Sequence, residues 1–350
     1  MVKLKNYNGR YCESEYESAF IAFLESVGWH YLAGNQIPRS YSEILIAEDF
    51  KAFIAKTSPN LLPVEAEQLY DTVRLAGAES DFATLHKVYK WLVDGVQFTP
   101  QNGLPVMVPL IDFETPENNI FRVVNQFTVK YINNGQRETR RPDVLLFVNG
   151  MPLCVIELKN PADAHATIYD AWEQITIRYW RDIPQLLHYC PLACISDGVK
   201  TRLGTVRTPY EHFYAWRRVN EGDKLSTMPF EETETMVRGV YAPERFLEIF
   251  RDYIYFQDEV FDCDEREIVC RYPQFFAARL LKQSIVKSVV EQTGKGGTYF
   301  GATGCGKTYT MAFLARQLSL RCGDIPQIGS PTIVMIVDRE ELQEQGIKLF

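Results

Sequence analysis

Apolar residues recur at every third or fourth position in the first part of the chain. The pattern is clearest over residues 14–27, where the spacing predicts an amphipathic helix that ends at Gly28. Similar helix-rich sequence covers residues 43–54 and 63–93 and stops at a polar break over residues 99–105. The chain is therefore expected to begin with a mainly helical segment.

The period of the pattern changes after this break. Residues 119–131 and 144–159 are rich in Val, Phe, Tyr and Ile, which favour strands. The runs Asn133-Asn134-Gly135 and Asn149-Gly150 are typical of tight hairpin turns. These segments predict successive antiparallel strands.

Three segments follow from the rest of the pattern. The spacing over residues 164–180 predicts a helix, and the apolar run at residues 192–196 predicts another short buried strand. Together with the preceding helices and strands they indicate an α/β domain over residues 1–220. Residues 221–265 begin with polar, acidic, turn-rich sequence and are interpreted as a linker with connecting helices. A second α/β pattern occupies residues 266–350.

This last segment has the pattern of a parallel sheet. We expect a short strand at residues 297–300, a helix over residues 309–318 and a continuous apolar strand at residues 332–337.

Composition narrows the class of protein. The chain has 350 residues, of which 46% are hydrophobic, so it can build real cores. No apolar run approaches the roughly 18 residues that span a bilayer, and the start lacks a secretion signal, so we expect a cytoplasmic protein. The eight cysteines form no C-x-x-C pair, which argues against a disulfide framework or a zinc ribbon.

The net charge of −8 disfavours a protein that coats nucleic acid, because such binding relies on Lys and Arg. It leaves local basic surfaces open. Arg137, Arg140 and Arg141 form one such cluster, which is interpreted either as DNA-facing or as an ordinary solvated face.

Asp143, Glu157 and Lys159 carry the residue types of a metal-dependent nuclease, which needs carboxylates to hold an ion and a positive group near the reacting phosphate. Side chains alternate along a strand, so Glu157 and Lys159 share a face. With an ideal two-residue turn at Asn149-Gly150, however, Asp143 would pair with Ile156 and point to the wrong side. The chemistry therefore requires one extra residue or a β-bulge.

A Glu-x-Lys triplet alone is common on surface strands. The joint pattern of Arg141-Pro142-Asp143-Val144, a hairpin, and Glu157-Leu158-Lys159-Asn160-Pro161 resembles the PD-(D/E)xK nuclease family. The amino-acid sequence of these segments is similar to that of the restriction (R, or HsdR) subunit of type I restriction-modification enzymes.

The resemblance implies further site residues. The family carries a Q-x-x-x-Y element after the nuclease strand, and the corresponding Gln174 and Tyr179 are one residue further apart here. On an α-helix that shift would turn Gln174 away by about 100°. Glu17 matches the acidic position that these nucleases place near the metal, or is an ordinary exposed helix glutamate.

A second site is predicted near the other end. The run Gly301-Ala302-Thr303-Gly304-Cys305-Gly306-Lys307-Thr308 is a complete phosphate loop, whose backbone N–H groups cradle phosphates, whose lysine reaches the β and γ phosphates, and whose Thr308 holds Mg²⁺. Gln274 resembles the adenine-side glutamine of superfamily 2 helicases, and residues 338–345 resemble the next helicase motif.

The fold implied by the resemblance is a PD-(D/E)xK domain with a mixed sheet flanked by helices, followed by the start of a RecA-like parallel α/β motor lobe. No Asp-Glu-x-His box or second motor lobe follows, so we expect an N-terminal fragment that does not turn over ATP by itself.

The function implied is that of an endonuclease and ATP-dependent DNA translocase subunit, with Mg²⁺ and ATP as cofactors. Its implied partners are double-stranded DNA and the methyltransferase (M) and specificity (S) subunits. Two alternatives remain: a single-chain restriction or repair nuclease-helicase, and an inactive nuclease fold that only docks DNA.

Overall fold

The computed structural model describes residues 13–77, 79–101, 103–160, 167–225, 231–257 and 265–336. The chain divides into two compact units, Met1–Leu247 and Glu248–Phe350, and each is described by itself. The boundary lies inside the segment that the sequence assigns to the linker. Part of that segment belongs to the first unit, where the indole Nε1 of Trp29 donates a 2.6 Å hydrogen bond to the carbonyl of Tyr241.

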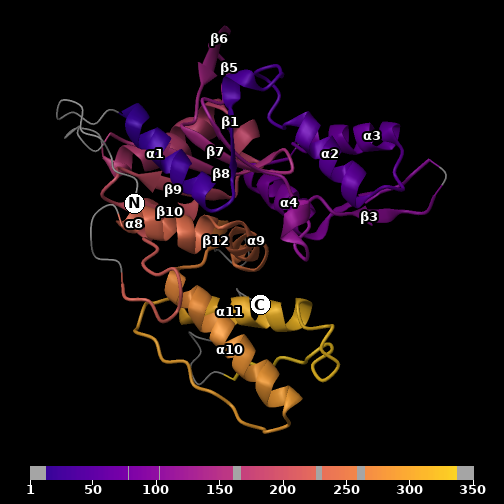
Figure 1. Cartoon of the computed structure of the whole chain (residues 1–350), viewed down its shortest axis with the longest axis vertical. Helices are drawn as coiled ribbons and strands as arrows, with labels where there is room; N and C mark the ends of the chain where they lie inside the picture. The colour runs from indigo at the N-terminus through magenta and orange to yellow at the C-terminus, as the bar shows by residue number, and fades with distance from the viewer. Residues whose placement is uncertain are drawn as a thin grey trace. The chain divides into compact units, whose positions relative to one another are not determined.

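The first unit is built on a mixed six-stranded sheet (Figure 1). In spatial order its strands are β1 (His30–Ala33), β4 (Phe121–Asn125), β7 (Val144–Val148), β8 (Met151–Leu158), β9 (Leu192–Ser196) and β10 (Thr201–Thr205). The β1–β4 and β8–β9 pairs are parallel and the other three are antiparallel. Every residue of β7, β8 and β9 is buried, because helices cover both faces of these apolar runs.

The helices agree with much of the periodic pattern. Those before the sheet's central strands are α1 (Glu13–Ser26), α2 (Ala47–Thr57), α3 (Pro63–Arg74) and α4 (Asp81–Asp94). The long helical pattern over residues 63–93 is thus two helices, and the second starts where Ser80 Oγ accepts a hydrogen bond from the amide of Ala83. Short 3₁₀ turns lie at Gly34–Gln36, Pro116–Asn118 and Tyr210–His212.

Helical segments after β8 complete the first unit. They are α5 (Ile168–Glu173), the π-helical turn η3 (Gln174–Tyr179), α6 (Trp180–Asp182), α7 (Pro184–Leu187), α8 (Glu231–Met236) and the π-helical turn η5 (Val237–Tyr241), with α9 (Pro243–Asp252) crossing the boundary.

Two small antiparallel hairpins lie outside the main sheet. One pairs β2 (Val96–Phe98) with β3 (Val106–Val108), and the polar break predicted from the sequence lies between these two strands in the chain. The other pairs β5 (Val129–Asn133) with β6 (Gln136–Arg140). The apolar run predicted as one strand over residues 119–131 therefore breaks at Gln126, which has φ 55°.

The second unit contains a hairpin of β11 (Ile254–Gln257) and β12 (Arg266–Val269), followed by α10 (Tyr272–Val290) and α11 (Lys307–Leu320). The ring of Tyr253 lies 4.8 Å from that of Phe275 and 5.5 Å from that of Phe313, so it joins the two helices. The helix predicted at residues 309–318 is present within α11.

Two predicted strands of this unit are wrong for the residues that the structure describes. Residues 297–300 and 332–336 are irregular, and Phe300 and Ile336 are 92% and 90% exposed. A parallel strand needs neighbours that complete its hydrogen bonds and cover both faces, and among the described residues none pairs with either segment. The RecA-like sheet expected from the sequence is therefore not seen. Residue 337 lies outside the described residues.

Over the described part of the chain, no helix combines the length and apolar character needed to cross a membrane.

Candidate active site

The β7–β8 hairpin contains the irregularity that the nuclease chemistry requires. Its turn has two residues, Asn149 and Gly150, with φ of 51° and 77°. Phe147 pairs with Pro152, yet Leu146 pairs with Cys154, so Leu153 is an extra residue in β8.

The bulge changes the register beyond it. Val144 pairs with Ile156, which places Asp143 beside Glu157 rather than beside Ile156. The amide of Leu158 donates a 2.8 Å hydrogen bond to Asp143 Oδ2, and the amide of Asp143 lies 3.4 Å from Glu157 Oε1. The two carboxylates are thus brought together at the end of the hairpin.

Glu157 is fully buried, whereas Asp143 is partly exposed. Burial raises the pKa of Glu157 well above its usual range, and the neighbouring negative charge of Asp143 raises it further. Lys159 opposes this effect because its Nζ lies 3.9 Å from Glu157 Oε2. Ionising Glu157 beside Asp143 is therefore costly unless a positive charge lies close to both carboxylates.

Lys159 extends the line of β8 toward the same face as Glu157. Its amide donates a 2.8 Å hydrogen bond to the carbonyl of Ser196, which continues the pairing with β9. Its Nζ donates a 2.9 Å hydrogen bond to Gln174 Oε1, and Gln174 Nε2 donates a 2.8 Å bond to Glu157 Oε2. Gln174 therefore bridges the ammonium and the buried carboxylate.

The altered spacing of Gln174 and Tyr179 does not separate them. Five residues along an α-helix would leave their side chains about 140° apart. These residues instead form the π-helical turn η3, whose wider i→i+5 ring absorbs the extra residue. Gln174 Nε2 lies 2.8 Å from Tyr179 Oη, and that hydroxyl donates a 2.5 Å hydrogen bond to Glu157 Oε1. The expectation that the shift turns Gln174 away is wrong.

Glu17 approaches the site from α1. Asn125 Nδ2 donates a 2.6 Å hydrogen bond to Glu17 Oε1, and Asn125 pairs with Val144, the residue after Asp143. The Nε2 atom of Gln126 lies 3.5 Å from Glu17 Oε2. The Oε1 atom of Gln126 accepts a 3.0 Å hydrogen bond from the guanidinium group of Arg141. Sequence reasoning missed Asn125 and Gln126, whose only signal is their place where an apolar strand stops.

The donor set suits a hard divalent cation. Asp143 and Glu157 supply carboxylate oxygens, and the carbonyl of Ile156 or Leu158 is a further candidate ligand. No group of three or more His, Cys, Asp or Glu side chains that could hold a metal occurs among the described residues. Mg²⁺ commonly uses one or two carboxylates and keeps several waters, so two carboxylates that repel each other in a buried place fit it.

Residues 301–308, which the sequence predicts to be a phosphate loop, lead into the start of α11. Gly304 and Gly306 have φ of 78° and 79°, which glycine adopts at low cost. Lys307 Nζ donates hydrogen bonds of 2.9 and 3.0 Å to the carbonyls of Gly301 and Ala302, so the loop curls around its own ammonium group.

Gln274, on α10, contacts this loop directly. Its Nε2 donates a 3.0 Å hydrogen bond to the carbonyl of Gly306, and its Oε1 accepts a 2.8 Å bond from the amide of Arg271. Thr303 is exposed, while Cys305 and Thr308 are partly exposed. The helicase-like motif over residues 338–345 lies outside the described residues.

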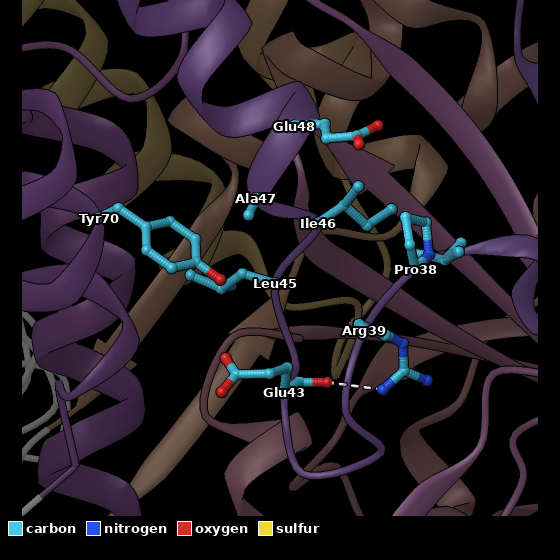
Figure 2. A pocket seen from close by; sticks show the side chains of 9 residues that line it. Pro38, Arg39, Glu43, Leu45, Ile46, Ala47, Glu48 and Tyr70 are labelled. Atoms are coloured by element: carbon cyan, nitrogen blue, oxygen red, sulfur yellow. Dashed lines mark hydrogen bonds between the residues drawn. The ribbon is translucent and has the colours of Figure 1, made fainter. Parts of the chain in front are cut away.

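A small hollow of about 120 Å³ in the first unit is lined by none of these candidate residues and lies between the loop before α2 and Tyr70 of α3 (Figure 2). Arg39 lines it, and its two terminal nitrogens donate 2.7 Å hydrogen bonds to the carbonyls of Glu43 and Thr128. Its guanidinium lies 3.4 Å from the ring of Phe127, and burial lowers the pKa of Arg39 to about 10. The cation is thus used to hold backbone segments together.

Two known families match parts of this chain. Residues 10–212 match the family described as type I restriction enzyme R protein N terminus. Residues 273–350 match the family described as SWI2/SNF2 ATPase. The first match includes every residue of the nuclease set, and the second includes the phosphate loop.

Curated relatives carry names of the same kind. The chain is 30% identical over 355 residues to the type I restriction enzyme HindI endonuclease subunit of Haemophilus influenzae, covering 97% of this chain and 32% of that protein. It is 28% identical over 363 residues to the putative type I restriction enzyme MjaIXP endonuclease subunit of Methanocaldococcus jannaschii, covering 95% and 33%. The chain spans about a third of the length of these relatives, and on this evidence it belongs to the family of type I restriction enzyme R proteins.

Proposed function

We propose that Asp143, Glu157 and Lys159 form the hydrolytic site of an endonuclease that cleaves double-stranded DNA with Mg²⁺. The observation that carries the proposal is the bulged register of β7 and β8, which places both carboxylates together and leaves Lys159 hydrogen-bonded into the same cluster. A merely structural hairpin has no need to bury a carboxylate beside a second one, because that burial is costly.

Phosphodiester hydrolysis requires water to attack phosphorus while the growing negative charge is neutralised. Mg²⁺ held by Asp143 and Glu157 would supply Lewis acidity and a more acidic bound water. Lys159 contributes a fixed ammonium group beside the carboxylates, where it orients the attacking water or stabilises the phosphate charge. Glu17, on α1, accepts a hydrogen bond from Asn125 of the adjoining strand β4 and would be a further carboxylate for an ion that keeps its waters.

Gln174 and Tyr179 are positioning residues in this proposal. The Gln174 amide contacts both Lys159 and Glu157, and the Tyr179 hydroxyl contacts the second oxygen of Glu157. Together they fix the carboxylate plane and the direction of the ammonium group, which preorganises the site before DNA binds.

We further infer that the phosphate loop binds ATP as part of a DNA-translocating motor in the longer enzyme. Lys307 would exchange its two loop carbonyls for β and γ phosphate oxygens, and Thr308 would hold the nucleotide's Mg²⁺. Gln274 links the adenine side to the loop through Gly306. Methyltransferase and specificity subunits would supply site recognition, and translocation would precede cleavage.

Supercoiled-plasmid cleavage by the longer enzyme with its M and S partners, Mg²⁺ and ATP tests the proposal. Lys159→Ala should reduce cutting by a factor of about 100 or more, since losing one charge contact in a transition state costs roughly 3 kcal/mol. Lys90→Ala on α4, an exposed lysine of the same unit, is the matched control and should cut normally.

DNA-stimulated ATP hydrolysis by Lys159→Ala should stay near the wild-type rate, because the two sites lie in different units. Normal cleavage by Lys159→Ala would refute the assignment. Cleavage that persists without any divalent cation would refute the metal.

A further inference from the structure

The β5–β6 hairpin is a two-stranded ribbon that does not join the main sheet. It lies in the chain between β4 and β7, and Figure 1 shows it projecting beyond the strands of the first unit. Its turn residues Asn134 and Gly135 have φ of 48° and 81°, the tight geometry that keeps two strands regular up to their tip.

On one face of the ribbon the polar and charged side chains are paired within the protein. Tyr131 pairs across the strands with Glu138 and donates a 2.5 Å hydrogen bond to it, and Asn133 Nδ2 donates a 2.8 Å bond to the same carboxylate. Arg140 on this face forms a 2.6 Å ion pair with Asp182. Charge on this side is balanced within the protein.

The opposite face is not balanced. Strand alternation places Lys130, Ile132, Arg137 and Thr139 there, all exposed, with Ile132 at 76%. Lys130 Nζ lies 5.2 Å from the ring of Tyr41, and neither Lys130 nor Arg137 forms an ion pair with any described carboxylate. We call these four residues the basic ribbon face. It offers two cations around an exposed aliphatic side chain.

We propose that the basic ribbon face docks in the major groove of duplex DNA beside the cleavage site, a proposal that rests on the nuclease function above. Charge complementarity supports this occupant, because Lys130 and Arg137 share their face of the ribbon with no carboxylate and so suit phosphates on both walls of a groove. The major groove admits a two-stranded ribbon, and an aliphatic side chain such as that of Ile132 suits a thymine methyl group.

The position along the chain supports the same occupant. Arg137 and Asp143 are six positions apart in the chain, which limits the distance between their Cα atoms to roughly 20 Å. One turn of duplex is about 34 Å. The ribbon therefore contacts DNA within one helical turn of the phosphate that the carboxylates engage, and it sets where the duplex lies over the site.

Fluorescence anisotropy of a labelled duplex tests the proposal, with Ca²⁺ in place of Mg²⁺ so that binding is measured without cleavage. The variant Lys130→Glu/Arg137→Glu should bind at least about tenfold more weakly than wild type, and its plot of log K against log salt should be shallower by about 2. The control Lys56→Glu/Lys90→Glu changes charge equally at exposed positions of α2 and α4 and should bind as wild type.

The milder variant Lys130→Gln/Arg137→Gln guards against misfolding and should show the same direction. Equal binding by wild type and both ribbon variants would overturn the proposal, as would equal weakening of the control. Equal losses on single-stranded and duplex oligonucleotides would overturn groove docking. A wild-type chain that neither binds nor, in the longer enzyme, cuts DNA would instead refute the proposed function itself.

Discussion

Replacing Glu157 by Gln tests whether the buried carboxylate exists to hold a metal ion. The substitution keeps the shape of a fully buried side chain and removes its charge, while Asp143 stays in place. If Asp143 and Glu157 hold a divalent cation as proposed, the cation would offset the repulsion between the two carboxylates, so its binding should stabilise the first unit. In the variant one of two anionic ligands is missing, so that stabilisation should largely disappear.

The magnitude follows from the donor set. Two carboxylates with water in the other positions make a weak site, with a dissociation constant of about 1 mM. At about 10 mM Mg²⁺ such a site stabilises the folded state by about 1.4 kcal/mol. For a unit of this size that corresponds to a rise in Tm of roughly 3–6 °C.

The assay is thermal unfolding followed by tryptophan fluorescence. All five tryptophans lie between residues 29 and 216, so the signal reports the first unit alone. Wild type should show the Mg²⁺-dependent rise, and Glu157→Gln should show less than about a third of it. Asp143→Asn should behave like Glu157→Gln, whereas Lys159→Ala should keep the rise because it removes no anionic ligand. Equal shifts in wild type and Glu157→Gln would refute the reasoning.

Three further outcomes are expected. Because burial raises the pKa of Glu157 in the folded state, ionising it costs stability once the pH exceeds the ordinary value of 4.5; in metal-free urea unfolding the stability of Glu157→Gln relative to wild type should therefore increase as the pH rises above that value, and a constant difference would contradict the shift. Tyr179→Phe keeps the buried ring but removes one donor to Glu157, so cleavage should fall about tenfold with unfolding free energy changed by less than about 2 kcal/mol; unchanged cleavage would remove its positioning role. Lys307→Ala should abolish DNA-stimulated ATP hydrolysis by the longer enzyme, measured as phosphate release, while the Mg²⁺-dependent rise in Tm of the first unit persists; retained hydrolysis would show that the loop is not the motor's nucleotide site.

The sequence could predict the β7–β8 hairpin because its signals are local and chemical. Side chains alternate between the two faces of a strand, so the carboxylates of Asp143 and Glu157 can lie side by side only if the hairpin contains an extra residue. The structure has this residue as a bulge at Leu153. The position of the extra residue was not predicted, although Pro152 directly before it is a local signal, because a proline cannot donate a ladder hydrogen bond and in a central strand is found at bulges.

Other features depend on contacts far along the chain. The strands predicted at residues 297–300 and 332–337 need partners on either side, and an apolar run alone cannot supply them. The π-helical turn of Gln174 and Tyr179 was not predictable either, because one added residue can rotate a helix or widen one turn. Which occurs depends on the hydrogen bonds with Glu157, which local sequence does not contain.

The widened turn also has an effect on its neighbours. On one side Trp172 Nε1 donates a 2.9 Å hydrogen bond to the carbonyl of Thr208, and on the other Trp180 Nε1 donates a 2.9 Å bond to the carbonyl of Val206. Both indoles are thus hydrogen-bonded to the backbone of the same segment, residues 206–208, which follows β10. The one extra residue between Gln174 and Tyr179 is accommodated in the π-helical turn, while Trp172 and Trp180 on either side of it keep these hydrogen bonds. The number of residues between Gln174 and Tyr179 therefore does not by itself fix where their side chains lie, because a change in helix type brings both of them to Glu157 at this spacing.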